Sequence, residues 1–309
     1  GIEELILKYA NENDQRYGYS WGLKDGTGGD ELFLRSDFRM PSAGGALYHE
    51  SNYTLGRWRF TAGLRFDFEH ARLRYRNYTD TWYTKAHIKN ETAYERPIDI
   101  DDRSTLKQTF TELLPKFSVM YSFDETRNLY LTIAKGYKSG GFNTQIFSDV
   151  LQQKMMNRMG IGEVYDVQRG VAYKPEYSWN YEIGGHFSCM EGAVRGDFAL
   201  FYIDCRDQQL TVFPPGQTTG RMMTNAGRTR SLGAEAAVQI SPWRTFDINL
   251  AYGYTDARFV RYETTVKNDD GDPVRISYKD NRIPYAPQHT LSAGAAWTVP
   301  TGVKWLGDL

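Results

Sequence analysis

The sequence predicts an all-β protein, a transmembrane antiparallel up-and-down β-barrel, and three features of the chain support this fold class. Apolar and polar residues alternate with a period of two in many separate segments. Aromatic residues, which include 22 Tyr, 16 Phe and 7 Trp, gather on the apolar side of these segments. Short and long links alternate between the segments. The 309 residues are enough for one large domain or two ordinary ones.

The period-two segments are typical of β-strands with one apolar and one polar face. In 58–68, the apolar face carries Trp58, Phe60, Ala62, Leu64, Phe66 and Phe68. The same alternation recurs in 117–123, 129–133, 177–187, 232–240, 246–254 and 291–297. An amphipathic helix would need apolar residues at i, i+3 and i+4, and these segments lack that spacing.

The composition restricts the classes of function. A net charge of −1 provides no bulk basic field for binding nucleic acid. The mean hydropathy is −0.59, and no stretch approaches the roughly 18–20 apolar residues of a spanning helix. A spanning strand needs an apolar residue only at every second position, so a polar average is compatible with a membrane. The two cysteines, Cys189 and Cys205, are too few for a disulfide framework, and the expected hairpin keeps them apart.

The links between the expected strands fall into two length classes. Short links are expected at 56–57, 124–127, 191–192 and 241–245, and long polar links at 78–105, 141–176, 209–226 and 258–287. Outer-membrane barrels have short periplasmic turns and longer extracellular loops, with aromatic girdles at both interfaces. A soluble Greek-key sandwich is the alternative fold. Its strands also alternate, but it has no reason to sort its loops by length.

The pattern predicts nine strands and a tenth at 16–23, while residues 1–14 resemble a short helix. We expect one set of side chains to point away from the barrel axis: Leu64, Phe66, Trp179, Ile183, Val238, Leu250 and Trp297. A second set should point toward the axis: Arg65, Glu182, Glu235 and Asn249. A register slip of one residue would reverse every assignment on a strand, so these faces test the fold sharply.

Several strings resemble the TonB-dependent outer-membrane receptors of the iron-complex or siderophore type. Gly136-Tyr-Lys-Ser-Gly-Gly-Phe-Asn143 resembles the "GYK-GGFN" loop of that family. Lys174-Pro-Glu-Tyr-Ser-Trp-Asn-Tyr-Glu-Ile-Gly184 is similar to its "KPE–S–NYE-G" strand. Further matches lie at 61–65, 199–204, 224–227 and 283–290. Each string is weak alone, but their order and strand-sized spacing over roughly 45–298 make the resemblance specific.

The resemblance implies a barrel of 22 strands in the bacterial outer membrane, in contact with its lipids and closed by an N-terminal plug. This chain has nine or ten expected strands, and no plug-like region or TonB box precedes them. We therefore expect residues 1–309 to be part of the barrel domain, without the plug and the last strands. The pattern is weakest over 1–44.

The function implied by the resemblance is the uptake of a scarce nutrient, with an iron–siderophore complex as the expected substrate. The implied partners are a small-molecule metal chelate and, through the absent N-terminal region, the TonB complex that supplies energy. No nucleic acid partner is expected. The alternative is a passive porin-like or structural outer-membrane barrel, in which loops fold inward to set the pore size and no plug exists.

Ligand contacts are expected from the long links, above all the link at 141–176, and from the upper wall of the lumen. The candidate residues are Tyr137, Lys138, Phe142, Asn143, Gln145 and Arg158. Aromatic, amide and cationic groups suit an aromatic or carboxylate-bearing iron chelate. The alternative is an ordinary solvated surface loop. Met155, Met156 and Met159 are expected to pack as a small apolar cluster within a helix of this link.

No catalytic constellation is found in the sequence, so we expect no enzyme activity, no cofactor and no metal site. The five histidines lack the i, i+4 spacing of metal ligands on a helix. His186 with Glu182 could bind a metal, although a solvated lumen histidine is the simpler interpretation. The acidic clusters at 99–102 and 269–272 lack the EF-hand register and are interpreted as loop turns.

Overall fold

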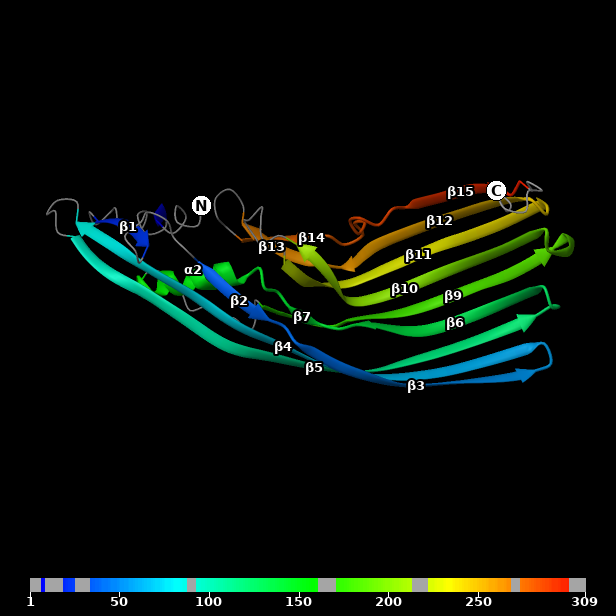
Figure 1. Ribbon diagram of the computed structural model, residues 1–309, viewed down its shortest axis with the longest axis horizontal. Helices are drawn as coiled ribbons and strands as arrows, with labels where there is room; N and C mark the ends of the chain where they lie inside the picture. Colours follow the sequence, from blue (N-terminus) through cyan, green and yellow to red (C-terminus); the bar gives the residue numbers. More distant parts are fainter. Residues whose placement is uncertain are drawn as a thin grey trace, which may run out of the picture.

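The computed structural model describes residues 7–8, 19–25, 34–87, 93–160, 171–212, 222–267 and 273–299. These residues form a wide, curved antiparallel sheet whose strands do not close into a barrel (Figure 1). The all-β fold class is therefore confirmed. Among the described residues, no helix combines the length and the apolar character needed to cross a membrane.

The main sheet contains eleven strands: β1 (Tyr19–Asp25), β2 (Arg35–Arg39), β3 (Ser42–Leu55), β4 (Trp58–His87), β5 (Ala93–Ser122), β6 (Arg127–Lys138), β9 (Glu176–Cys189), β10 (Val194–Val212), β11 (Met222–Trp243), β12 (Phe246–Arg261) and β15 (His289–Trp297). Two small ladders lie outside it, β7 (Gly141–Phe142) with β8 (Ala172–Tyr173) and β13 (Glu263–Lys267) with β14 (Pro273–Ser277). The helix α2 (Phe147–Arg158) lies between β7 and β8, and the 3-10 turn η2 (Met190–Gly192) joins β9 to β10.

The strand order is β1-β4-β5-β6-β9-β10-β11-β12-β15, with β2 and β3 also paired to β4. The strands β1, β2 and β3 follow one another along a single edge of β4, opposite 81–87, 74–78 and 58–71. They are therefore three pieces of one interrupted strand. This interruption explains why the sheet contains eleven strands where the sequence pattern predicts nine or ten.

The register places the two predicted sets of side chains on opposite faces. Residues directly opposite each other in an antiparallel pair share a face. Leu250 lies opposite Val238, while the adjacent Asn249 lies opposite Gln239. We call the face of Arg65, Glu182, Glu235 and Asn249 the polar face, and the face of Leu64, Phe66, Ile183 and Leu250 the apolar face. These four apolar side chains are 45–48% exposed, which suits contact with lipid rather than water.

The expected long link at 78–105 is wrong, because residues 78–87 and 93–105 belong to the strands β4 and β5. The strands β4 and β5 contain 30 residues each and pair from Trp58 opposite Tyr121 to Ala86 opposite Ala93. Their distal halves carry polar residues on both faces, so they lack the alternation that reveals a strand in a sequence. The paired backbone still makes the ladder hydrogen bonds, and the result is a long hairpin that extends well beyond the other strands (Figure 1).

The other links agree better with the sequence. Short connections join β3 to β4, β5 to β6, β9 to β10 and β11 to β12 at one end of the sheet. Cys189 lies opposite Val194, as expected, and both cysteines are free. The strand β10 extends to Val212 and β11 begins at Met222, so the link expected at 209–226 is shorter. Residues 7–8 are helical, and the remainder of 1–14 lies outside the described residues.

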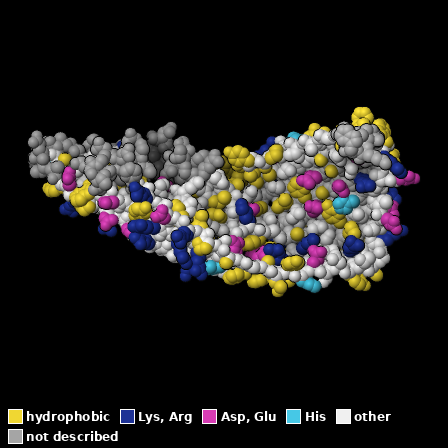
Figure 2. Space-filling model, in the orientation of Figure 1, with side chains coloured by type: hydrophobic (Ala, Val, Ile, Leu, Met, Phe, Trp, Pro, Cys, Tyr) yellow, Lys and Arg dark blue, Asp and Glu magenta, His cyan; other side chains and the backbone are white. Residues whose placement is uncertain are grey.

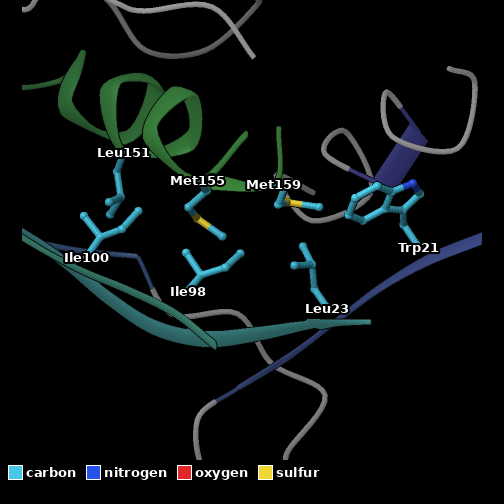
Figure 3. Close-up of a cluster of buried hydrophobic side chains, with 7 residues drawn as sticks. All are labelled: Trp21, Leu23, Ile98, Ile100, Leu151, Met155 and Met159. Carbon is cyan, nitrogen blue, oxygen red and sulfur yellow. The ribbon is translucent and has the colours of Figure 1, made fainter. Parts of the chain in front are cut away.

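The distal part of the β4–β5 hairpin carries the core of the described chain. One buried cluster contains Trp21, Leu23, Ile98, Ile100, Leu151, Met155 and Met159, and a second contains Leu73, Tyr75, Ile146, Phe147 and Val171. Figure 3 shows Leu151 and Met155 of α2 pointing toward Ile98 and Ile100 of β5. Met155 and Met159 therefore pack in one apolar cluster, but against the sheet rather than within the helix, and Met156 is buried outside this cluster. The helix covers the polar face, on which Leu73 and Tyr75 lie.

Candidate ligand-binding site

The candidate residues lie along the segment that leaves β6, forms β7 and continues into α2. Tyr137 and Lys138 end β6, Phe142 ends β7, and Arg158 is the last residue of α2. The antiparallel order places this segment, the tip of the β4–β5 hairpin and the β12–β15 link at the end opposite the short turns (Figure 1). The long connections therefore share one end of the sheet, as the sequence predicts.

Asn143 connects this segment to the start of β11, at Met223, which lies 80 positions later in the sequence. Its side-chain amide donates to the carbonyl of Met223 at 2.8 Å and accepts from the Met223 N–H at 2.7 Å. Its own backbone N–H donates to the Val171 carbonyl at 2.7 Å. The buried side chain thus acts like an additional strand partner for the first residues of β11, and it fixes the base of the segment.

A second amide connection lies beside the first, and the sequence reasoning missed it. Asn225 accepts a hydrogen bond from the Lys174 N–H at 2.8 Å and donates to the Lys174 carbonyl at 2.9 Å. Gln209 donates to the Ser139 carbonyl at 2.8 Å and to the Lys174 carbonyl at 3.1 Å. Asn225 lies in the 224–227 string that carried the family resemblance, and that string was the available signal.

The aromatic candidates lie at the base of the segment. Phe142 is half-buried and packs against the cluster that contains Leu73 and Phe147. The ring of Tyr137 lies 5.9 Å from the ring of Tyr177. Its buried hydroxyl has no hydrogen-bond partner within the described part of the chain. In the same region, burial raises the pKa of Tyr173, and the nearby carboxylate of Glu69 raises it further.

The structure separates Arg158 from the other candidates. It lies at the far end of α2, and a 12-residue helix is about 18 Å long. There it lines a cavity of about 370 Å³ together with Ile100, Asp101, Asp102, Lys154 and Asn157. Lys154 neutralises Asp102 across this cavity, with Nζ 2.5 Å from Oδ2. Lys138 and Gln145 are exposed, so their side chains are available to a ligand.

The polar face also carries a cavity of about 430 Å³ on the wall formed by β6, β9, β10, β11, β12 and β15. Tyr130, Glu182, Asp197 and Glu235 line it, and the Tyr130 hydroxyl donates to Glu182 at 2.8 Å. The Nδ1 atom of His186 makes a hydrogen bond with a carboxylate oxygen of Asp197 and none with Glu182. No group of three or more metal-ligating side chains is found among the described residues.

Replacing Asn143 with alanine should loosen the base of the segment. The substitution leaves the partly buried N–H and carbonyl of Met223 without the side chain that bonds them, which costs about 1–3 kcal/mol. Hydrogen exchange of 222–224 in the whole receptor should therefore become faster, whereas Gln145→Ala, at an exposed position, should leave it unchanged. Unchanged exchange in Asn143→Ala, accompanied by weaker ligand binding, would assign Asn143 a direct contact with the ligand instead.

Comparison with known proteins agrees with this architecture. The family model described as "TonB dependent receptor-like, beta-barrel" matches residues 6–308. The pesticin receptor of Yersinia enterocolitica is 26% identical over 197 residues, which cover 63% of this chain and 24% of the receptor. The chain thus spans about a quarter of the length of the curated relatives it matches.

Two solved structures share the fold. The ferric yersiniabactin uptake receptor FyuA from Yersinia pestis aligns with a TM-score of 0.53 at 19% identity, over 87% of this chain and 33% of that one. The siderophore receptor PiuA from Acinetobacter baumannii aligns with a TM-score of 0.56 at 15% identity, over 90% and 38% of the two chains. The curved sheet, its apolar face and the match over 6–308 lead to one assignment. The chain belongs to the TonB-dependent receptors and forms part of their outer-membrane β-barrel.

Proposed function

We propose that the whole protein takes up a scarce nutrient, with an iron–siderophore complex as the substrate class and the TonB complex as the source of energy. The family match over residues 6–308 carries this proposal. FyuA is a ferric yersiniabactin uptake receptor and PiuA is a siderophore receptor, and these two relatives support the substrate class. We further propose that residues 1–309 lie within one barrel domain of a longer protein.

The proposed ligand contacts come from the candidate residues at the end with the long connections. Tyr137 and Phe142 offer aromatic surface, and Lys138 and Arg158 offer cations for the oxyanions of a metal chelate. Asn143 and Gln145 complete the set with amide groups. The exposed Lys138, Gln145 and Arg158 are ready for contact, whereas Asn143 acts first as a structural support. Because tight capture makes release slow, transport requires an external energy source.

The decisive experiment deletes residues 144–170 in the intact receptor and measures uptake of the iron complex by cells. High-affinity uptake should be lost while the barrel remains folded and inserted, because the deletion removes α2 together with the candidate contacts Gln145 and Arg158. Unchanged energised uptake after the deletion would disprove capture by this segment. Uptake that continues in cells without TonB would instead favour a passive porin.

A finer variant separates ligand contact from the packing of α2. Lys138→Gln/Arg158→Gln removes two exposed cations and leaves the buried clusters intact. Affinity for the iron complex should fall roughly tenfold or more, since each charge-assisted hydrogen bond to a ligand oxyanion contributes about 1.5–3 kcal/mol. The matched control, Arg57→Gln/Arg244→Gln, removes two cations from the short turns at the opposite end and should retain full affinity.

A further inference from the structure

The apolar face changes character abruptly along β4. From Trp58 to Phe68, its positions carry aromatic and aliphatic side chains. The next positions on the same face are His70, Arg72, Arg74 and Arg76. The neighbouring strands add cations at the same level, since Arg39 lies opposite Arg74 and Lys107 lies opposite Arg72. We define the cationic patch as Arg35, Arg39, Arg72, Arg74, Arg76, Arg103 and Lys107.

The cationic patch sets like charges directly opposite each other three times. The pairs are Arg39 with Arg74, Arg72 with Lys107, and Arg76 with Arg103. Like charges directly opposite each other on one face destabilise a sheet. Figure 2 shows Lys and Arg side chains concentrated over β2 and β4. Anions close to these pairs are therefore needed to offset the repulsion between the cations.

The described carboxylates balance only part of this charge. On the apolar face of 35–39, 70–78 and 101–109, Asp37 and Asp101 are the acidic residues. Asp101 bridges Arg76 and Arg103 at 2.9 and 2.5 Å, and hydrogen bonds from these two guanidinium groups hold its pKa well below the usual range. Arg39, Arg74 and Lys107 are exposed, and none of them has an ion pair with a described carboxylate. The patch therefore keeps an excess of positive charge.

The position of the cationic patch relates it to the membrane surface. Eleven residues from Trp58 to Phe68, at ~3.3 Å each and tilted by ~45°, span about 24 Å, which matches the apolar band of an outer-membrane barrel. By the same geometry, Arg72 lies roughly 9 Å and Arg76 roughly 19 Å beyond this band. The patch lies toward the long connections and away from the short turns, which places it at the outer leaflet.

We propose that the cationic patch binds the phosphate groups of a phosphorylated glycolipid in the outer leaflet of the outer membrane. The planar guanidinium of arginine bonds phosphate oxygens in pairs, which suits a patch rich in Arg. Leu64, Phe66 and Phe68 lie directly below on the same face and would contact the acyl chains. The patch faces away from the polar face, so it lies outside the proposed path of the nutrient. Free phosphate would form the same hydrogen bonds with arginine, but it has no acyl chains to contact Leu64, Phe66 and Phe68.

The test measures how strongly the detergent-purified full-length receptor binds a phosphorylated glycolipid, by native mass spectrometry and by bound phosphate. Arg39→Gln/Arg74→Gln should weaken binding roughly 30-fold, equivalent to about 2 kcal/mol at 1.4 kcal/mol per tenfold, because each cation near an anionic surface contributes about 1 kcal/mol. Arg57→Gln/Arg244→Gln removes the same charge at the short turns and should bind like the wild type. Heat-modifiable gel migration confirms that each variant is folded.

The wild-type receptor alone gives a second test that does not depend on the folding of a variant. Removal of the phosphates from the glycolipid should weaken binding at least as much as the double substitution, because it removes the anions that all seven cations of the patch contact. Millimolar inorganic phosphate should compete poorly, since it lacks the acyl chains. Equal binding of the dephosphorylated lipid, or an unchanged affinity in a folded Arg39→Gln/Arg74→Gln, would overturn the proposal. Full displacement by inorganic phosphate would also overturn it and indicate a general anion site.

Discussion

Replacing Phe147 with alanine should release α2 from the β4–β5 hairpin at a cost of about 3–5 kcal/mol. The side chain is fully buried, and its ring centroid lies 4.6 Å from that of Tyr75 and 5.0 Å from that of Phe38. The Phe147 carbonyl also accepts a hydrogen bond from the side-chain amide of Asn77 at 3.0 Å. A cavity at this position removes the main apolar contact at the first turn of the helix.

Hydrogen exchange of the α2 amides in the full-length receptor measures this effect. Exchange in Phe147→Ala should be faster by two orders of magnitude or more, because 1.4 kcal/mol corresponds to a factor of ten. Ser148→Ala is the matched control, since its hydroxyl makes only a long 3.4 Å hydrogen bond, and it should change stability by less than about 0.5 kcal/mol. If the α2 amides of Phe147→Ala stay fully protected, the helix is held by other contacts.

Introducing arginine at Leu250 should destabilise the intact barrel by about 2–4 kcal/mol, the cost of such a charge at the middle of the bilayer on a lipid-facing position. Leu250 is the middle residue of 246–254 and lies on the apolar face opposite Val238 and Ala293. The adjacent Asn249 lies on the polar face opposite Gln239 and Gly294. Asn249→Arg is therefore the matched control and should cost far less.

The comparison requires denaturant unfolding of both variants in lipid vesicles, with the wild-type receptor as the reference. The two substitutions introduce the same side chain at neighbouring positions, so both variants gain the same charge. A larger cost for Asn249→Arg than for Leu250→Arg would mean that the face assignment is reversed by a register slip of one residue. Equal costs would mean that neither face contacts lipid.

The sequence predicts the membrane-facing part of the fold well because lipid imposes the pattern. Strands such as 58–68 must present apolar groups at every second position, and that constraint is visible without any structure. Beyond the bilayer the constraint ends. Residues 78–87 and 93–105 form the distal hairpin with polar groups on both faces, and a pattern search therefore interprets them as a loop.

The candidate site shows a similar limit. Its residue types and its place in the chain are visible in the sequence, because the "GYK-GGFN" string marks the segment. The hydrogen bonds of Asn143 to Met223 and of Asn225 to Lys174 are not visible in the sequence. The first joins residues that are 80 positions apart, and the second joins residues that are 51 positions apart. The contact of α2 with Trp21 and Leu23 is equally hidden, because it depends on a helix packing over a sheet from distant parts of the chain.

The strand order of the main sheet has a kinetic consequence. Apart from β1, β2 and β3, which all pair with β4, neighbouring strands in the main sheet follow one another in the chain. The contact order of this sheet is therefore low. Four of its ladders close over the short connections that join β3 to β4, β5 to β6, β9 to β10 and β11 to β12, and such hairpins form quickly. The β6–β9 ladder must instead close over the segment that contains α2. The entropy lost on closure grows with loop length, so the β6–β9 ladder should form after the hairpins. The proposed ligand contacts lie on the segment that this ladder closes, and they should therefore be assembled last.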